Sequence, residues 1–568
     1  MTKGIRGLLE VLFVSAICLI SFLFVRGHEK DDAPTSDEGY HLFAGAEYVD
    51  DGTYWVNLEH PPLLKNFAGL ALEPLHLPTP SMGKAPLDHT PHNNYIRFLY
   101  GAPVPADRIV SAARRPFPFL LVFLVVVVYV VTRQVFGIAA APLAAGLIAL
   151  EPSFVANASI VHTDVGAALT MTATIALGLW AARRRHVVCW LAVGLALGLA
   201  LATKFSAVIL VPAVLLFPVF SWLVEKPRPP WPVFRERLLG AAVAVGLAVL
   251  TLAAVYAIDM RRMPREYARE AVRLHLAGRG ANAETIERYA RFSDFSAPLG
   301  HYLAGLKGVA LFSQNGRGAN YFHGRVSQSG FLLYFPVAFL IKTTPSLLAL
   351  VFLIPILGRR ETFAYWPLGL LLCALGILAL SMSSSFNIGV RHILPLYPLV
   401  AIAGAGLVAR RLTPRVMAAF SGVLLVSSGI SLARIHPFEL AYFNFLVGGP
   451  RHGVEWLSDS NLDWGQDLKR VSLFLKEKGW DADTTLVSYS GIATNYYLPK
   501  VKLLEKDDPI RPGRYAVSAL METLGEPFVA TIEGPEGGRK VGELVRVLHE
   551  RGRKVATVGY TFTIWELR

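Results

Sequence analysis

Residues 116–136 read PFPFLLVFLVVVVYVVTRQVF, a stretch in which Arg133 is the one charged residue. About 20 consecutive apolar residues are long enough to cross the hydrocarbon core of a bilayer as an α-helix. Similar runs recur along the 568 residues, and the chain as a whole is 53% hydrophobic and only 17% charged. This composition is too apolar for a soluble protein of this length, so the sequence predicts a polytopic α-helical membrane protein.

The length criterion predicts about eleven transmembrane helices, of which the third is the shortest. The predicted spans are residues 8–25, 116–136, 138–150, 165–182, 187–203, 205–224, 238–258, 335–357, 363–382, 392–408 and 416–432. The first span resembles a signal peptide, but Arg26-Gly27-His28-Glu29 provides no small-residue cleavage site. We therefore expect a retained first helix, with cleavage of this segment as the alternative.

Lys and Arg residues collect in alternate short loops, and this pattern predicts the orientation of the helices. With the N-terminus in the cytoplasm, the loops on that side hold Arg133, Arg183-Arg184-Arg185 and Arg410-Arg411. The short loops on the other side hold only Lys204 and Arg391. Topology therefore explains the formal net charge of +13 without a nucleic-acid partner.

This orientation divides the chain into a transmembrane domain, residues 1–432, and an exported C-terminal domain, residues 433–568. Residues 26–115 and 259–330 are exported loops of the first domain. The C-terminal part is long enough for its own core, and its strand-like and helix-like patterns predict an α/β fold. The expected strands are residues 485–490 and 515–518 and a pair within 555–567, and the expected helices are residues 468–478 and 541–551. The three cysteines, Cys18, Cys189 and Cys373, lie in apolar runs, so we expect no disulfide framework.

Two acidic motifs lie in the first exported loop. Asp37 and Glu38 follow the first span, and Glu59-His60-Pro61-Pro62 precedes an apolar stretch, residues 63–72. Adjacent acids are often simply solvated. The proline pair, however, forces a sharp entry into what we expect to be an interfacial helix, which would hold Glu59 and His60 near the membrane surface.

A further acid, Asp164, directly precedes the fourth predicted span, two residues after His162. Its ordinary interpretation is a helix N-cap. An acid at the edge of a membrane helix is costly unless it faces water or a cation. Lys204, Lys342 and Arg391 approach the same predicted membrane face, although each alone would be an ordinary interfacial side chain.

Carboxylates beside cations at a lipid–water boundary suit the transfer of a sugar from a polyprenyl-phosphate carrier to a hydroxyl group. A carboxylate can act as general base on the acceptor hydroxyl. Preorganised Lys and Arg side chains can stabilise the charge that develops on the leaving phosphate. The polyprenyl chain would stay in the lipid.

Four motifs resemble a known superfamily, the GT-C glycosyltransferases: Asp37-Glu38, Glu59-His60-Pro61-Pro62-Leu63, His162-Thr163-Asp164 and Arg391-His392-Ile393-Leu394-Pro395. Within it the chain is similar to family 39, the branch of protein O-mannosyltransferases and aminoarabinose transferases. Residues 334–345 and 459–468 resemble bacterial members. Each motif alone is weak, but their order and predicted side make the resemblance, which covers nearly the whole chain, fairly specific.

The resemblance implies a GT-C-like fold and roles for individual residues. Asp37 would be the base, Asp164 a second catalytic carboxylate, and Glu38 a further acid of the catalytic set. The remaining implied residues would bind the donor phosphate (Lys204, Arg391, Lys65 and Lys342) or line the pocket (Glu59, His60 and His162). Glu38, Glu59 and His60 are also candidates for binding a divalent cation where one is used. His60 departs from the family pattern, because aminoarabinose transferases tend to carry a phosphate-contacting Lys there.

The leading hypothesis is therefore a membrane glycosyltransferase with a polyprenyl-phosphate sugar as donor and a protein, lipid or envelope glycan as acceptor. The family's usual inversion at the anomeric carbon is implied only by the resemblance. The alternatives are a polyprenyl-lipid or sugar transporter or flippase, which would place its charges nearer the midplane, and a non-catalytic assembly factor. We expect the inner membrane of a bacterium, and no cofactor beyond a possible divalent cation. Residues 459–467 could form a sugar or acceptor surface, but capping and packing is the preferred interpretation.

Overall fold

The computed structural model describes residues 3–27, 30–78, 91–315, 319–357, 364–488 and 491–568. Seven helices in this part of the chain are long and apolar enough to cross a membrane. They are α1 (Lys3–Gly27), α6 (Phe117–Phe136) continuing from α5 (Ala106–Arg114), α9 (Asp164–Ala181), α11 (Leu210–Val224) continuing from η3 (Phe205–Ile209), α12 (Trp231–Asp259), α18 (Tyr365–Met382) and α20 (Pro414–Ile435).

Further apolar segments complete the helical bundle. The helices α7 (Ala141–Ala149) and α8 (Pro152–Ala158) form a pair bent by 56° that can count as one span. Three shorter apolar helices are α10 (Cys189–Thr203), α17 (Pro345–Leu357) and α19 (Leu396–Ala409). The described residues thus hold seven helices that meet the length criterion, or eight if the bent pair is one span, and these three shorter apolar helices beside them. The predicted polytopic α-helical fold is confirmed.

One predicted span is wrong as a continuous helix. Residues 335–357 form two helices, α16 (Tyr334–Lys342) and α17, with Thr343 in an extended conformation between them. Pro345 accounts for the break, because proline disfavours helical backbone in the residue before it and cannot donate a hydrogen bond. The side chain of Glu151, at the bend between α7 and α8, accepts hydrogen bonds from the backbone nitrogen and the hydroxyl of Thr344. Backbone donors freed by the break are thereby satisfied, as the lack of water in a bilayer requires.

The first loop that was predicted to be exported folds into short helices: α2 (Glu38–Ala46), η1 (Glu47–Asp51), α3 (Leu63–Leu72), η2 (Glu73–Leu75) and α4 (Pro91–Tyr100), followed by α5. Helix α3 coincides with the predicted helix over residues 63–72. It crosses α2 at Gly45 and Gly69, where each Cα lies so near the other backbone that a Cβ on either residue would clash with a carbonyl. This close crossing fixes α2 against the loop that carries His60.

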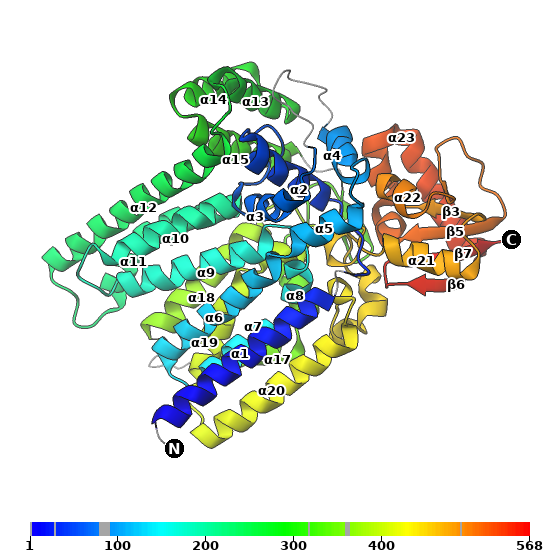
Figure 1. Cartoon of the computed structure of the whole chain (residues 1–568). Helices are drawn as coiled ribbons and strands as arrows, with labels where there is room; N and C mark the ends of the chain where they lie inside the picture. The colour runs from blue at the N-terminus through cyan, green and yellow to red at the C-terminus, as the bar shows by residue number, and fades with distance from the viewer. Residues whose placement is uncertain (1–2, 28–29, 79–90, 316–318, 358–363, 489–490) are drawn as a thin grey trace.

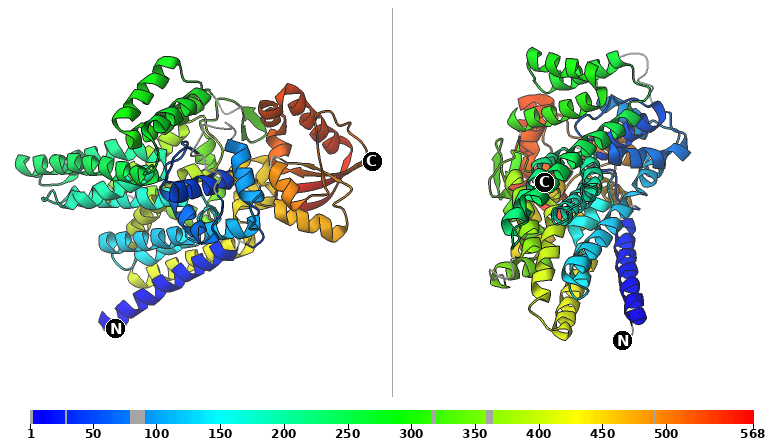
Figure 2. Two further views of the ribbon diagram at one scale, coloured as in Figure 1. Left: turned by 45° about the horizontal axis from the view of Figure 1, so that its top comes forward. Right: turned by 90° about the vertical axis from the view of Figure 1, so that its left-hand side faces the viewer.

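The second segment with a predicted exported location contains α13 (Arg265–Gly278), α14 (Ala283–Phe295) and α15 (Ala297–Asn315), then a hairpin of β1 (Asn320–Phe322) and β2 (Arg325–Ser327). The right-hand view of Figure 2 shows these green helices and the blue helices of the first loop together at the end of the bundle opposite the N-terminus. The two loops that were predicted to be exported thus share one end of the molecule.

The C-terminal α/β unit has a mixed five-stranded sheet of order β4-β3-β5-β7-β6. Its elements are α21 (Leu468–Lys478), β3 (Thr484–Val487), α22 (Gly491–Tyr497), β4 (Lys502–Leu503), β5 (Gly513–Ser518), α23 (Ala519–Arg551, kinked at Gly534), β6 (Gly552–Val558) and β7 (Phe562–Leu567). Strand β3 runs parallel to β4 and β5, whereas β7 is antiparallel to β5 and β6. The unit lies beside the bundle, at the right of Figure 1. The predicted α/β class of this region is confirmed.

Residues 436–467 connect α20 to this unit through four short turns of 3-10 helix: η5 (Glu439–Ala441), η6 (Phe445–Val447), η7 (Pro450–Glu455) and η8 (Asp459–Asn461). This connecting segment packs against the bundle. The ammonium group of Lys342 donates to the carbonyls of Leu440 and Asn461, at 2.7 and 2.6 Å, and the Asn461 side chain accepts from the backbone nitrogen of Val390. The chain that enters the α/β unit is therefore anchored at the end of the bundle where the exported loops lie.

Candidate functional site

Five of the predicted site residues come together at this end of the bundle. Asp37 directly precedes α2, His162 and Asp164 lie at the start of α9, Lys204 follows α10, and Arg391 lies in the short turn η4 (Val390–Ile393). They come from four separate parts of the sequence. The helix ends of the bundle bring them within contact distance of one another, as the following distances show.

Asp164 is the buried centre of this group, with a fully covered side chain. Lys204 donates to one carboxylate oxygen of Asp164, and the other oxygen lies 2.5 Å from Nδ1 of His162 and 3.7 Å from Nη1 of Arg391. Asp164 thus compensates the charges of two buried cations. A buried charge needs such partners, because an isolated ion that is removed from water loses its hydration energy without any attraction to offset the loss.

Arg391 links Asp164 to Asp37. Its Nη1 donates to Nε2 of His162 at 2.8 Å, and its Nη2 lies 3.5 Å from a carboxylate oxygen of Asp37. The guanidinium plane lies over the ring of Trp464, with 4.0 Å between Cζ and the ring centroid. Within the described part of the chain, the buried Nε of Arg391 has no acceptor. This N–H remains available to an anionic ligand.

Asp37 differs from Asp164 in its exposure. Its side chain is 33% exposed, and the nearest atom of His162, Nε2, lies 3.7 Å from it. It does not cap α2 with its side chain. A carboxylate that is partly open and held beside a cation can accept a proton from an incoming hydroxyl group.

Trp464 belongs to residues 459–467, for which the preferred interpretation from the sequence was capping and packing over a role as a sugar or acceptor surface. Its ring is nearly buried, packs edge-on against His162 at 5.2 Å, and covers Arg391. Its backbone carbonyl accepts from the nitrogen of Ser36, and its nitrogen donates to the side chain of Gln466. The connecting segment therefore places the aromatic ring of Trp464 next to the group that contains Asp37. The available signal was the cluster of acids and polar groups around Trp464 in the sequence.

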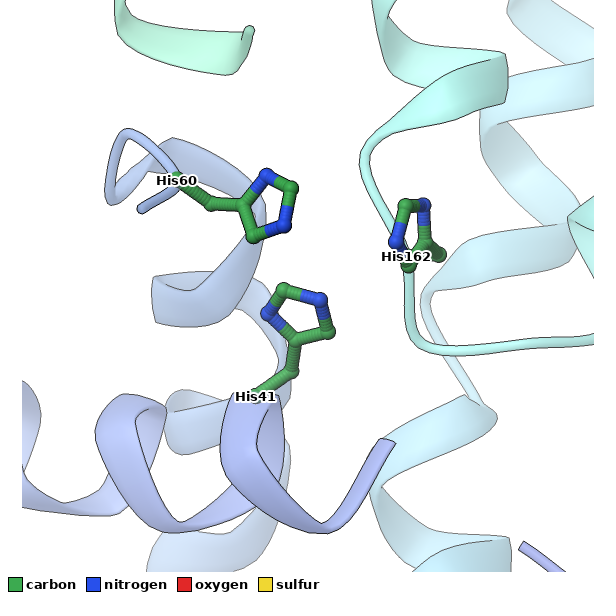
Figure 3. A group of neighbouring side chains, drawn as sticks. All are labelled: His41, His60 and His162. Carbon is green, nitrogen blue, oxygen red and sulfur yellow. The ribbon is translucent and has the colours of Figure 1, made fainter. Parts of the chain in front are cut away.

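Three histidines surround the same space. Figure 3 shows the rings of His41, from α2, and His60, from the loop before α3, facing the ring of His162. The ring centroids of His41 and His162 are 5.0 Å apart, and those of His60 and His162 are 5.5 Å apart. Burial is the main cause that holds the pKa of His41 and of His60 well below the ordinary value, and it also lowers the pKa of His162.

The structure does not bring Glu38 into the group, although it follows Asp37 directly. Its carboxylate is fully buried and accepts from Nε and Nη2 of Arg114 at 2.8 and 2.6 Å. The backbone nitrogens of Thr35 and Val161 donate to the same two oxygens. Both oxygens are engaged in joining the first loop to α5 and to the loop before α9, so the geometry does not support the expectation that Glu38 is catalytic or binds a metal.

Three other predicted residues also lie outside the contact group. The ammonium of Lys65 donates to Tyr48 and to the carbonyls of Asn57 and His60. Lys342 is engaged by two carbonyls, as described above. Glu59 forms a half-exposed ion pair with Arg279. All three N–H groups of Lys65 and two of those of Lys342 are engaged in holding loops together, so the geometry does not support these lysines as phosphate ligands.

The remaining arrangement is chemically simple. A partly open carboxylate, Asp37, lies beside a buried guanidinium, Arg391, whose position is fixed by a buried carboxylate, an imidazole and an indole ring. Such a group can orient an anionic ligand and accept a proton next to it. Lys204 adds a second cation whose side chain is 11% exposed.

Comparisons with known proteins point to one family. The sequence profile of the dolichyl-phosphate-mannose-protein mannosyltransferases matches residues 44–228. The matched segment includes His60, His162, Asp164 and Lys204, whereas Asp37 and Arg391 lie outside it. No curated protein matches the chain significantly.

Solved structures of several glycosyltransferases are similar only at a low level. ArnT from Cupriavidus metallidurans in the apo state is 14% identical, with 99% of this chain and 98% of that chain covered and a TM-score of 0.33. The protein O-mannosyltransferase Pmt1-Pmt2 complex of S. cerevisiae bound to its sugar donor is 19% identical, covering 44% and 34%, with a TM-score of 0.33. The Archaeoglobus fulgidus oligosaccharyltransferase in complex with Zn and sulfate is 14% identical, covering 92% and 70%, with a TM-score of 0.43. TM-scores this low do not establish a common fold. Over residues 44–228, however, the profile match confirms the resemblance that the motifs predicted, to the dolichyl-phosphate-mannose-protein mannosyltransferase family of glycosyltransferases.

Proposed function

We propose that this protein is a membrane glycosyltransferase that transfers a sugar from a polyprenyl-phosphate carrier to a hydroxyl group on the outer side of a bacterial inner membrane. The observation that carries the proposal is the pairing of a partly open carboxylate, Asp37, with Arg391, a buried guanidinium that keeps one N–H without an acceptor. The profile match to a family named for transfer from dolichyl-phosphate-mannose supports the class of donor.

The donor phosphate would bind to Arg391, and Lys204 would contribute a second positive charge. Asp164 neutralises part of that charge, so the two cations can remain buried before the donor binds. As the bond between phosphate and sugar breaks, negative charge grows on the phosphate. Positioned cations stabilise this charge without reorganising at the moment of reaction.

Asp37 would accept the proton of the acceptor hydroxyl. The carboxylate of Asp37 is partly exposed and can accept a proton. The carboxylate of Asp164 is fully buried, and Lys204, His162 and Arg391 surround it. A direct attack by the hydroxyl oxygen on the anomeric carbon, opposite the leaving phosphate, would invert that carbon. The hydroxyl could belong to a protein, a lipid or an envelope glycan.

The test is transfer of label from a radiolabelled polyprenyl-phosphate hexose by the purified protein in detergent. We expect Asp37→Asn to lower transfer at least about 100-fold, the range lost with a general base, while binding of unlabelled polyprenyl phosphate changes little. Glu455→Gln is the matched control, since this acid is exposed and, among the residues that the structure describes, forms an ion pair only with His452 on the same turn. It should retain full transfer.

Full transfer by Asp37→Asn would refute the assignment of the base. Movement of the labelled lipid across liposomes without any transfer would instead indicate the transporter that the apolar sequence alone also allows.

A further inference from the structure

His41, His60 and His162 form a cluster whose possible ligand atoms all lie within 4.8 Å of one another. They come from α2, from the loop before α3 and from the loop before α9, so no local sequence motif forces them together. Figure 3 shows the three rings turned toward a common space. Tetrahedral zinc with Zn–N bonds of about 2.0–2.1 Å needs nitrogens roughly 3.4 Å apart. Modest side-chain rotations would therefore close the cluster around an ion.

His41 is the strongest indication of a missing ligand. Its side chain is buried, at 1% exposure, yet neither ring nitrogen has a hydrogen-bond partner among the described residues. Leaving buried polar atoms unsatisfied is costly, and such atoms in native proteins usually have a partner such as water or an ion. A cation between the rings would provide one.

His162 has the second partner that is typical of a metal-binding histidine. Its Nδ1 lies 2.5 Å from the carboxylate of Asp164, which leaves Nε2 as the ligand atom. A carboxylate behind the imidazole fixes the tautomer and raises the basicity of the other nitrogen. Arg391 donates a hydrogen bond to that Nε2. On metal binding His162 would give up this hydrogen bond, and Arg391 would keep its contacts with Asp37 and Trp464.

Charged groups of both signs lie around the cluster. Lys65, Lys204 and Arg391 are near enough to act electrostatically on at least one of the three rings. Asp37, at 3.7 Å from Nε2 of His162, and Asp164 carry the opposite charge. The cations outnumber these two carboxylates, so the ion would be held by its short bonds to the three imidazoles.

We propose that His41, His60 and His162 bind one Zn²⁺ ion, with the fourth coordination position open toward Asp37. Three histidines with an open position are the ligand set of many catalytic zinc sites. The proposal concerns metal binding alone and stands whether or not the protein transfers sugars.

The experiment measures zinc bound to the full-length protein, purified in detergent through a tag without histidines. The protein is stripped with EDTA, reloaded with zinc chloride and freed of excess metal by gel filtration. We expect one zinc ion per wild-type chain, and binding lost at least about tenfold in His41→Ala and in His60→Ala. His301→Ala is the matched control, because His301 is equally buried, lies in α15 and also has a ring nitrogen without a partner. It should retain the ion.

A zinc K-edge absorption spectrum of the wild type provides a second readout that needs no variant. We expect scattering from three imidazoles. A wild type that retains no zinc after reloading, histidine variants that retain as much zinc as the wild type, or a spectrum without imidazole ligands would each overturn the proposal.

Discussion

Asp164→Asn is the substitution that best tests how the buried charges of the site are held. The change keeps the shape of the side chain but removes the negative charge that faces Lys204, His162 and Arg391. Asp37, which is 33% exposed, would be the one acid of the described residues left in contact with Arg391. Lys204 would lose its ion-pair partner while its side chain remains 11% exposed.

The expected cost follows from this burial. Removing one partner of a buried ion pair typically destabilises a protein by about 3–5 kcal/mol, because the other charge stays desolvated. At about 1.4 kcal/mol per factor of ten, the ratio of unfolded to folded protein should rise by roughly two to four orders of magnitude. Asp164→Asn combined with Lys204→Met removes both charges, and we expect it to recover about 0.5–3 kcal/mol of this loss.

The assay is unfolding in detergent with increasing SDS, followed by tryptophan fluorescence, for the wild type, the two single variants and the double variant. Asp294→Asn is the control, because its pair with Arg269 has side chains 46% and 32% exposed and should be worth less than about 1 kcal/mol. If Asp164→Asn unfolds at the wild-type midpoint, or if Lys204→Met has no effect in its background, the buried network does not hold the site together.

Two other predictions follow from buried groups outside this network. Glu38→Gln should destabilise the protein by about 3–5 kcal/mol, because Arg114 would stay buried after losing the carboxylate charge of Glu38, while transfer per folded molecule stays near that of the wild type; a stable but inactive Glu38→Gln protein would return Glu38 to the catalytic group. Burial lowers the pKa of His301 from 6.5 to about 4, so the folded protein keeps this ring neutral while the unfolded chain takes up a proton. The contribution of the neutral His301 ring to the free energy of unfolding should therefore be fully present above about pH 6.5. Roughly 3 kcal/mol should be lost as the pH drops toward 4. His301→Gln should flatten that dependence in thermal unfolding measured between pH 5 and 7.5, and an unchanged slope would contradict the burial argument.

The helical architecture could be predicted because it depends on one-dimensional patterns. Apolar runs of sufficient length set the spans, and the proline pair set the start of α3 at Leu63. The break at Thr343 was missed because hydropathy does not register where a proline interrupts an apolar run. Pro345 was the available signal.

The site could be predicted only in part, since contacts between distant segments decide it. Asp37, Asp164, Lys204 and Arg391 share a predicted side of the membrane, and the structure brings them together. The partner of Glu38, Arg114, lies 76 residues away in sequence, and nothing in the local pattern distinguishes it from other loop arginines. His41 could not be grouped with His60 and His162 from the sequence for the same reason, because these two residues lie in other parts of the chain.

The central claim is that the phosphate of a polyprenyl carrier binds beside Arg391 and Lys204 with Asp37 facing the reacting carbon. The most direct measurement is a structure of the protein determined with a polyprenyl-phosphate sugar bound. We expect the phosphate to accept a hydrogen bond from Nε of Arg391 and the sugar to lie between Asp37 and Trp464. A phosphate bound on another face of the bundle, with Nε of Arg391 still unpaired, would contradict the assignment of this site.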